Sequence, residues 1–258
     1  MKKMVIDGDV LAYSLSWVLD KNPNLDPQHL IKTKLLNISK GLGVDKGRLL
    51  ISGSISKEET YRYSLATIQP YKGNRTNKDK PKSFDLVKEY LKNCKAQIIS
   101  DGLEVDDYLA IEQSKDPENV IICSTDKDLK MIPGYHYNWV TNSFQTITPF
   151  EGCLNFCKQL LTGDRIDNIK GLSEKRPLRG IGDKTALNLL KHSTSYKEMI
   201  LIVLDQYKER YGKGEVKYKH WNELEDVTTT AEGVLQENAQ LLWIRRSVDE
   251  QWKLPSYM

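Results

Sequence analysis

The chain has 258 residues, of which 39% are hydrophobic and 28% charged, and its formal net charge is +3. This length fits one large α/β domain or a catalytic domain with a smaller appendage. The longest apolar stretches, such as residues 199–204, are too short to cross a bilayer, and the first residues lack a signal-sequence pattern. We therefore expect a cytoplasmic protein with no membrane partner.

Short buried strands alternate with helices through the first half of the sequence. The strands are predicted at residues 4–6, 49–52, 96–99 and 120–124, and the helices at 27–40, 83–93 and 106–114. This alternation predicts an α/β fold with a mostly parallel central sheet flanked by helices. Active sites in such sheets lie at the carboxyl ends of the strands.

The pattern changes near residue 150. A hairpin is predicted to pair residues 137–140 with 145–148, and the chain from 150 onward is predominantly helical. Residues 211–219 are rich in Gly and Lys and indicate an exposed loop, whereas 236–246 indicate a closing helix. We therefore predict a catalytic domain at residues 1–150 and a helical region at 151–258.

Acidic residues gather at the predicted strand ends and helix starts. The clusters are Asp7 with Asp9, then Glu104, Asp106 and Asp107, then Asp126 with Asp128, and finally Asp164 with Asp167. Each cluster alone is typical of a turn or a helix cap. Four together are harder to explain in that way, because like charges in one cleft repel unless cations occupy it. Oxygen ligands without histidine or thiolate favour Mg²⁺ or Mn²⁺, and a site of this size is typical of two-metal phosphoryl chemistry.

The segment QPYKGNRTNKDKPK lies between the second and third predicted strands. Its lysines beyond Asn77 are typical of a solvated turn. Tyr71 offers an aromatic face on which a base could stack. Lys72 and Arg75 are donors that could clamp a phosphate facing the metals.

The segment RGIGDKTALNLL resembles a phosphate-binding loop, but Asp183 stands where that motif requires glycine, so we reject an ATPase. A tight glycine turn before a helix still exposes backbone amides, which suits sequence-independent binding of a DNA phosphate. The turn and the helix start consist of Gly180, Ile181, Gly182, Lys184 and Thr185.

The small net charge hides a basic surplus. If eight carboxylates belong to one metal site, 38 basic residues stand against 27 remaining acidic ones, a surplus of 11. Such a surface suits a polyanion, although basic residues can also serve only to solubilise a protein.

The ordered motifs resemble the metal-dependent 5′ nucleases, which include flap endonucleases, the 5′ nuclease domain of bacterial polymerase I and small 5′-to-3′ exonucleases of tailed phages. The matching stretches, from residue 5 to 187, are VIDGD, QPYKGNR, LEVDDYLA, STDKDL, GDRIDNIKG and GIGDKTA. The compact length most resembles the phage exonucleases. The resemblance implies a PIN-like nuclease domain, a helical arch or clamp, and a helix-three-turn-helix DNA-binding element. A phage-encoded protein would act in the host cytoplasm.

The resemblance also implies the site residues. The ligands of two Mg²⁺ ions, for which Mn²⁺ would substitute, are Asp7, Glu104, Asp106, Asp107, Asp126, Asp128, Asp164 and Asp167. Lys72 and Arg75 approach the scissile phosphate. The glycine turn holds the duplex backbone, with a K⁺ ion bound there.

Three features depart from the family pattern. Many relatives carry an acid at the end of the second strand, where this chain has Ser52 to Ser54. Asp9 replaces a usually uncharged residue and is a ligand, an outer hydrogen-bond acceptor or a helix cap. The insertion-like GLSEKRPL lengthens the approach to the glycine turn, where Arg176 or Arg179 are further candidate DNA contacts.

The sequence thus predicts a Mg²⁺-dependent phosphodiesterase that removes nucleotides from the 5′ ends of duplex DNA or cuts 5′ flaps. We expect a monomer whose partners are DNA ends, nicks or flaps, together with replication proteins. Two alternatives stay open: an RNase acting on RNA or on RNA primers in hybrids, and a non-catalytic DNA-binding protein.

Overall fold

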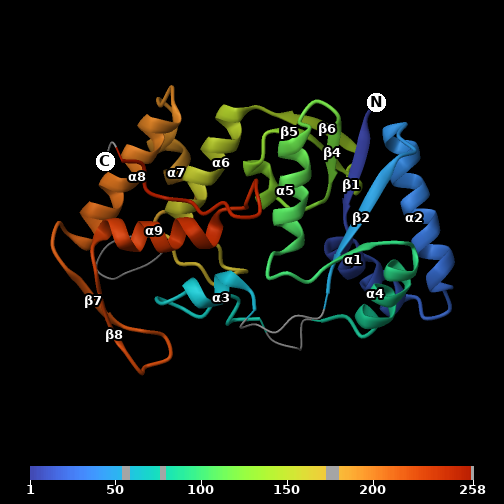
Figure 1. The fold of residues 1–258 in the computed structure, drawn as a ribbon, viewed down its shortest axis with the longest axis horizontal. Helices are drawn as coiled ribbons and strands as arrows, with labels where there is room; N and C mark the ends of the chain where they lie inside the picture. The colour runs from blue at the N-terminus through green and yellow to red at the C-terminus, as the bar shows by residue number, and fades with distance from the viewer. Residues whose placement is uncertain (54–58, 76–79, 173–179, 257–258) are drawn as a thin grey trace. The chain divides into compact units, whose positions relative to one another are not determined.

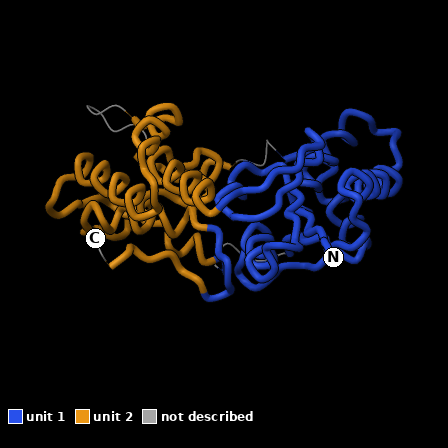
Figure 2. The backbone as a smooth tube through the Cα atoms, turned by 90° about the horizontal axis from the view of Figure 1, so that it is seen from above, with its two compact units in different colours: residues 1–60, 76–148, 244–249 blue, residues 61–75, 149–243, 250–258 orange. Residues whose placement is uncertain are grey.

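The computed structural model describes residues 1–53, 59–75, 80–172 and 180–256 (Figure 1). The chain forms two compact units, which Figure 2 colours separately. Unit 1 contains residues 1–60, 76–148 and 244–249, and unit 2 contains 61–75, 149–243 and 250–258. The assignment of a catalytic role to residues 1–150 and of DNA binding to 151–258 stays a prediction.

Unit 1 is built on a six-stranded sheet with the order β3-β2-β1-β4-β5-β6. Neighbours from β3 to β5 are parallel, and only β6 runs antiparallel to its neighbour β5. The strands are β1 Lys3–Asp7, β2 Gly47–Ser52, β3 Gln97–Ile99, β4 Val120–Cys123, β5 Gly134–Asn138 and β6 Ser143–Ile147. The predicted α/β class, the mostly parallel sheet and its first four strands are therefore confirmed.

Strand β1 occupies the point where the strand order changes direction. Its Ile6 lies opposite Leu49 of β2 on one side and Cys123 of β4 on the other. The carboxyl ends of β1 and β4 are consequently neighbours. The strands that follow them, β2 and β5, lie toward opposite edges of the sheet. Crevices at such switch points are the usual ligand-binding places of open α/β sheets.

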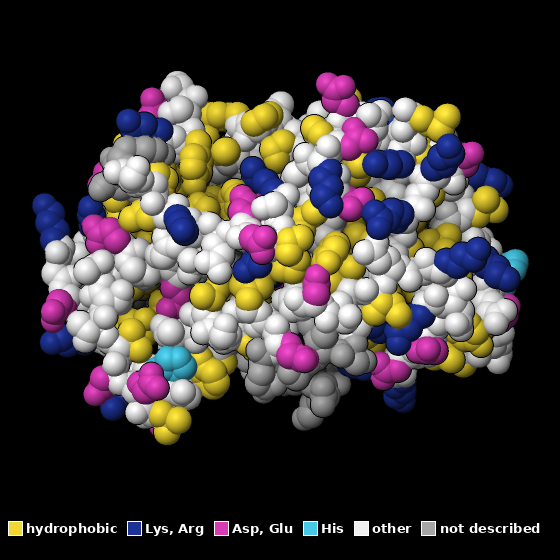
Figure 3. Space-filling model, in the orientation of Figure 1, with side chains coloured by type: hydrophobic (Ala, Val, Ile, Leu, Met, Phe, Trp, Pro, Cys, Tyr) yellow, Lys and Arg dark blue, Asp and Glu magenta, His cyan; other side chains and the backbone are white. Residues whose placement is uncertain are grey.

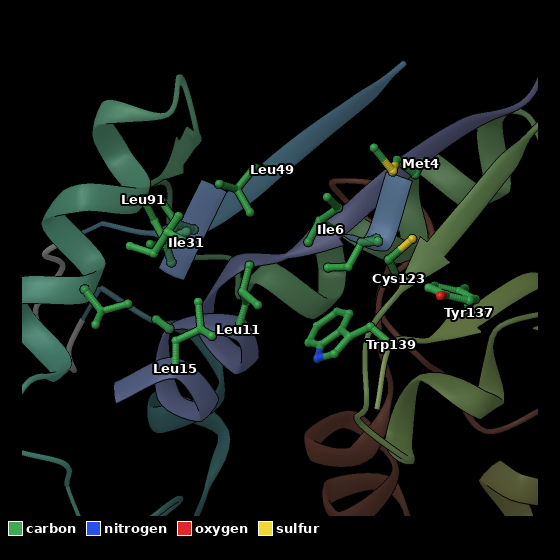
Figure 4. Packing of buried hydrophobic residues seen from close by; sticks show 14 of the residues in the cluster. Met4, Ile6, Leu11, Leu15, Ile31, Leu49, Leu91, Cys123, Tyr137 and Trp139 are labelled. Carbon is green, nitrogen blue, oxygen red and sulfur yellow. The ribbon is translucent and has the colours of Figure 1, made fainter. Parts of the chain in front are cut away.

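Helices cover both faces of this sheet (Figure 1). Helix α5 packs against β1, β2 and β4, whereas α1, α2 and α4 pack on one another over the opposite face. The helices of unit 1 are α1 Gly8–Lys21, α2 Pro27–Leu42, α4 Phe84–Asn93 and α5 Val105–Lys115, with a 3₁₀ turn at Asp128–Met131. Alternate strand residues such as Ile6 and Ile121 meet Leu11 and Leu15 of α1 in the core that Figure 4 shows.

Helix α1 was not among the predicted elements, although the other three helices were. It follows β1 with no intervening turn, and β-favouring Tyr13, Trp17 and Val18 interrupt its apolar stripe. The glycine of VIDGD makes this junction possible, because a Cβ at Gly8 would lie 2.3 Å from the carbonyl oxygen of Leu50. The helix therefore begins in close contact with β2.

The predicted hairpin of residues 137–148 forms, but with strand β5 shifted upstream to Gly134–Asn138. The side chain of Asn138 accepts hydrogen bonds from the amides of Val140 and Thr141, at 2.9 and 3.1 Å. These bonds turn the chain before Val140 can extend the strand.

Unit 2 is mainly helical, as expected beyond residue 150. Its elements are α3 Tyr61–Leu65, α6 Pro149–Thr162, α7 Asp183–Leu190, α8 Tyr196–Tyr211, α9 Ala231–Leu242 and the antiparallel pair β7 Val216–Lys219 and β8 Asp226–Thr229. The loop predicted at 211–219 is thus partly wrong, because Val216 and Tyr218 pair with the distant strand β8. No helix among the residues placed in the structure is long and apolar enough to cross a membrane.

Candidate active site

Asp7 ends β1 and is a buried predicted metal ligand, with 1% of its surface exposed. Its carboxylate caps α1 by accepting the amide of Val10 at 3.0 Å, and it accepts the hydroxyl of Ser124 at 2.7 Å. Burial, helped by the negative charges of Asp9 and Asp126, raises the pKa of Asp7 from 3.8 to about 7, although its hydrogen bonds from Ser124 and Val10 act in the opposite direction. A buried carboxylate with acidic neighbours favours a bound cation.

Asp126 and Asp128 follow β4, the strand beside β1. The amide of Asp126 donates to the hydroxyl of Ser124 at 3.0 Å, and the amide of Asp128 donates to Asp126 Oδ1 at 2.8 Å. Ser124 therefore links the acid of β1 to those after β4. The sequence interpretation missed this serine, although its place directly before the STDKD acids was a usable signal.

The acids of LEVDDYLA begin helix α5. Glu104 is the N-cap and Asp107 the reciprocal partner of a capping box, with the Glu104 amide donating to Asp107 Oδ2 at 3.1 Å. The other oxygen of Asp107 accepts the amide of Arg245 at 2.9 Å, and the side chain is fully buried. The carboxylate of Asp107 therefore holds two backbone segments together, and its role as a metal ligand stays a prediction. Asp106, partly exposed at the helix start, keeps its prediction as a ligand.

Asp9 brings a carboxylate to the end of β2, where the family pattern leads one to expect an acid and this chain has serine. Its Oδ1 accepts the amide and the hydroxyl of Ser52, at 3.1 and 3.0 Å. Lys88 of α4 donates to the same hydroxyl at 2.7 Å and lies 3.9 Å from Asp9 Oδ1. Asp9 is thus neither a simple cap nor isolated, and Lys88 is a basic neighbour that sequence reasoning did not identify.

These acids fit a hard divalent cation in their chemistry. The donors at the β1 and β4 edge are carboxylate and hydroxyl oxygens, and the raised pKa of Asp7 reflects a charge that a cation would compensate. Within the described part of the chain, no three His, Cys, Asp or Glu side chains converge closely enough to form a ready-made coordination sphere. The oxygen donors thus fit a hard divalent cation, and binding of the cation would bring them into a coordination sphere.

In unit 2, the GDRIDN turn is organised around Asp164. Its amide and carbonyl pair with those of Ile169, and its Oδ1 accepts the amides of Ile166 and Asp167 at 2.6 and 3.1 Å. Gly171, with φ of +54°, closes the same turn, because a Cβ there would lie 2.3 Å from the amide nitrogen of Gly163. Asp164 is 5% exposed, so its visible role is to shape the turn that presents Asp167.

The YKGNR segment docks on this turn. Asp167 accepts Tyr71 Oη at 2.9 Å and Arg75 Nη2 at 2.5 Å, and its carbonyl accepts the amide of Lys72 at 2.9 Å. The Lys72 ammonium lies 3.9 Å from the same carboxylate. Asn168 adds a hydrogen bond to the carbonyl of Pro70 at 2.9 Å. The two predicted phosphate-binding cations therefore converge on one predicted metal ligand.

Tyr71 does not fit the base-stacking role expected of it. Its side chain is 2% exposed, and its ring meets Tyr63 edge-on with centroids 5.2 Å apart. A ring covered in this way has no accessible face for a base. Its hydroxyl instead helps to position Asp167 beside Lys72 and Arg75.

The glycine turn ends at Gly182, the N-cap residue of α7, which has no side chain to cap the first amides of the helix. A Cβ at Gly182 would meet nothing within 4 Å, so the helix terminus is open, and Lys184 and Thr185 are exposed there. Asp183 adds a carboxylate to this end and lies 3.7 Å from Lys158. Binding of DNA phosphate or K⁺ at this turn stays a prediction. Ser54, Arg176 and Arg179 lie outside the described residues.

The sheet order and the helical second unit recur in solved structures of other proteins. Among solved structures, a phage T5 protein co-crystallised with metal ions matches with a TM-score of 0.62 and 20% identity, over 94% of this chain and 89% of that chain. A phage T5 flap endonuclease in complex with DNA and metal ions matches over the same shares, with a TM-score of 0.62 and 18% identity.

A third structure, the phage T5 5′-exonuclease with bound zinc, has a TM-score of 0.61 and 20% identity, again over 94% and 89% of the two chains. No family model matches this sequence, and no curated protein does so significantly. Similarity at these identities establishes a shared fold along nearly the whole chain. Activity has to be argued from the residues.

Proposed function

We propose that this protein is a divalent-metal-dependent 5′ nuclease that hydrolyses phosphodiester bonds in DNA, as a 5′-to-3′ exonuclease and a flap endonuclease. The observation that carries the proposal is the meeting of Asp7 and Asp126 through Ser124 at the switch point of the sheet. This is the place where the fold binds ligands, and the acids there have the donor chemistry of a Mg²⁺ site.

Within this proposal, the ions are held by the acids at the sheet edge and at the start of α5, namely Asp7, Glu104, Asp106, Asp107, Asp126 and Asp128, with Asp164 and Asp167 of unit 2 as the resemblance implies. Two Mg²⁺ ions, or Mn²⁺ in their place, would supply neutralisation of phosphate charge and a more acidic bound water. Lys72 and Arg75 would bind the phosphate oxygens, since both are held on one side of Asp167.

The finer points of the proposal concern the substrate and its binding. The open start of α7 would belong to a helix-three-turn-helix element and would hold one phosphate of duplex DNA. A K⁺ ion would bind at the same turn. The proposed substrates are duplex ends, nicks and 5′ flaps. The proposed state is a monomer that serves DNA replication, as in a phage life cycle.

The test of polarity and substrate is a product ladder. Duplex, nicked and 5′-flapped DNA, labelled at either end, is incubated with the protein in Mg²⁺, Mn²⁺ or EDTA. We expect metal-dependent products that begin at the 5′ end, with 5′ phosphates and 3′ hydroxyls. Preferential cutting of an RNA strand annealed to DNA would favour the RNase alternative, and binding without cleavage in either metal would favour the non-catalytic one.

Asp128→Asn tests the metal assignment directly. Removing this carboxylate charge should abolish Mg²⁺-dependent cleavage while leaving duplex binding in Ca²⁺ unchanged, because the substituted group serves the ion and not the duplex. Glu118→Gln, which removes an exposed acid away from the sheet edge, is the matched control and should cleave normally. Near-normal cleavage by Asp128→Asn would contradict the assignment.

A further inference from the structure

Two exposed aromatic side chains of α1 and a partly buried one of α4 form a line that leads away from the sheet-edge acids. Asp9, Tyr13 and Trp17 follow at intervals of four residues, so they share one side of α1. Tyr13 is 43% and Trp17 41% exposed, so both rings present a substantial part of their surface to solvent. The stripe of Leu11, Leu15 and Leu19 faces the core instead. The exposed side of α1 is therefore not needed to hold the helix on the sheet.

Phe84 of α4 joins the two helices into one surface. Its ring lies 6.4 Å from that of Tyr13, which in turn lies 6.2 Å from Trp17, all measured between centroids. We name Tyr13, Trp17 and Phe84 the aromatic track. Lys88 lies 5.9 Å from the centre of the Phe84 ring and also donates to Ser52 beside Asp9. The track thus starts at the acid cluster and continues without interruption within unit 1.

The far end of the track opens into a groove of about 530 Å³. Its walls include Trp17, Lys21, Leu25, Lys82 and Leu86. Lys21 and Lys82 are exposed. Figure 3 shows Lys and Arg side chains interspersed with hydrophobic ones on the face of unit 1 that carries α4. The surface thus combines apolar rings with positive charge.

The acidic groups beside the track are already engaged. Asp20 accepts the amides of Lys82 and Ser83, at 2.7 and 2.9 Å, and the Ser83 hydroxyl at 2.7 Å, which lowers its pKa. Asp85 is paired with Lys80 at 2.7 Å. The contacts of Asp20 fix the start of α4 beside the exposed lysines of the groove, Lys21 and Lys82, and Asp85 is exposed but paired with Lys80.

We propose that the aromatic track is a docking platform for single-stranded nucleic acid, namely the unpaired 5′ strand that runs out from the nuclease site. The inference rests on the proposed function for the direction of the strand. Bases stack on exposed rings without sequence preference, and lysines neutralise the phosphates between them. An apolar peptide of a protein partner is a poorer fit, because exposed Lys21 and Lys82 line the groove at the far end of the track.

Binding of a fluorescent oligothymidylate, with Ca²⁺ in place of Mg²⁺, tests the platform. Tyr13→Ala and Trp17→Ala should each weaken binding about tenfold, whereas Trp17→Phe should restore most of it. Trp221→Ala is the matched control, since Trp221 is similarly exposed at 44% but lies on the β7–β8 hairpin of unit 2. Circular dichroism checks that each variant is folded. If Trp17→Ala does not fold, Tyr13→Ala and Trp17→Phe still test the platform.

Heparin, a polyanion without bases, separates stacking from charge. Binding of heparin should be the same in wild type and Trp17→Ala. Equal losses for heparin and oligothymidylate, or wild-type oligothymidylate binding by both alanine variants, would overturn the platform. Failure of wild type to bind the oligonucleotide would do the same and leave a peptide as the better occupant.

Cleavage then distinguishes this inference from the proposed function. The ratio of flapped to blunt-duplex cleavage should fall about tenfold in Trp17→Ala, because only the flap supplies an unpaired strand. If the oligothymidylate binds through Tyr13 and Trp17 but no DNA is cleaved, the nuclease proposal is rejected and the docking platform is retained. Normal cleavage with an unchanged ratio would retain the nuclease and reject the platform.

Discussion

At the scale of single residues, Asp7 combines nearly complete burial with acidic neighbours. Its raised pKa has a defined sign: the folded protein binds a proton more tightly than the unfolded chain. Stability from this group is therefore fully present below pH 3.8 and is lost as the pH rises to about 7. The shift corresponds to roughly 4 kcal/mol when no cation is bound.

Asp7→Asn tests this consequence. In EDTA, the free energy of unfolding of wild type should fall relative to that of Asp7→Asn between pH 4 and 8, because asparagine can still accept the Val10 amide and carries no charge, while any loss of the Ser124 hydrogen bond does not depend on pH. Added Mg²⁺ should stabilise wild type at pH 8 and stabilise the variant less. If urea unfolding gave the same pH dependence for wild type and Asp7→Asn, the charge of Asp7 would not lower the free energy of unfolding.

Asp107 illustrates the opposite case, an acid of the motif whose visible work is structural. Asp107→Asn exchanges one accepting oxygen for a donor, so the amide of Glu104 or Arg245 loses its partner. We expect a loss of about 2 kcal/mol in unfolding free energy, equal in EDTA and in Mg²⁺. Asp106→Asn is the comparison, with a smaller loss. A destabilisation of Asp107→Asn that appears only with Mg²⁺ would restore Asp107 as a ligand.

At the scale of elements, the YKGNR and GDRIDN segments behave as one assembly. Asp167→Ala removes the acceptor shared by Tyr71 and Arg75, and a loss of about 1 kcal/mol would increase the open fraction about fivefold. Trypsin should then cut after Lys72 and Arg75 faster by that factor, as measured by mass spectrometry. Asp205→Ala, an exposed acid of α8, should leave the rate unchanged. Equal rates in both variants would mean that other contacts hold the segment.

At the scale of the whole molecule, the basic surplus predicts strongly salt-dependent binding of duplex DNA in Ca²⁺. Lys184→Ala, at the open start of α7, should weaken binding of all sequences alike and reduce the slope of log K against log salt by about one. Lys115→Ala, an exposed lysine of α5, is the control. A slope that Lys184→Ala leaves unchanged would remove the glycine turn from the DNA surface.

The periodic pattern of the sequence was sufficient for the sheet and for most helices of unit 1, because local hydrophobic periods fix such elements. The acids after β1 and β4 were predictable for the same reason, since parallel strands bring their carboxyl ends to one edge. Helix α1 and the β7–β8 pair were not predictable in this way. Helix α1 can begin where it does because Gly8 allows close packing on β2, and the β7–β8 pair forms by pairing between two separate segments of the chain.

The sequence by itself determined which residue types this protein brings to its sheet edge, namely carboxylates, and which motifs accompany them. Only the tertiary structure decided what each one does. Burial made Tyr71 a positioning residue, and tertiary contacts gave Asp107 a second backbone partner. Hydrogen bonds through Ser124 joined Asp7 to the backbone amide of Asp126. The physical reason is that a side chain's role depends on its partners and its exposure, and distant segments of the chain supply both.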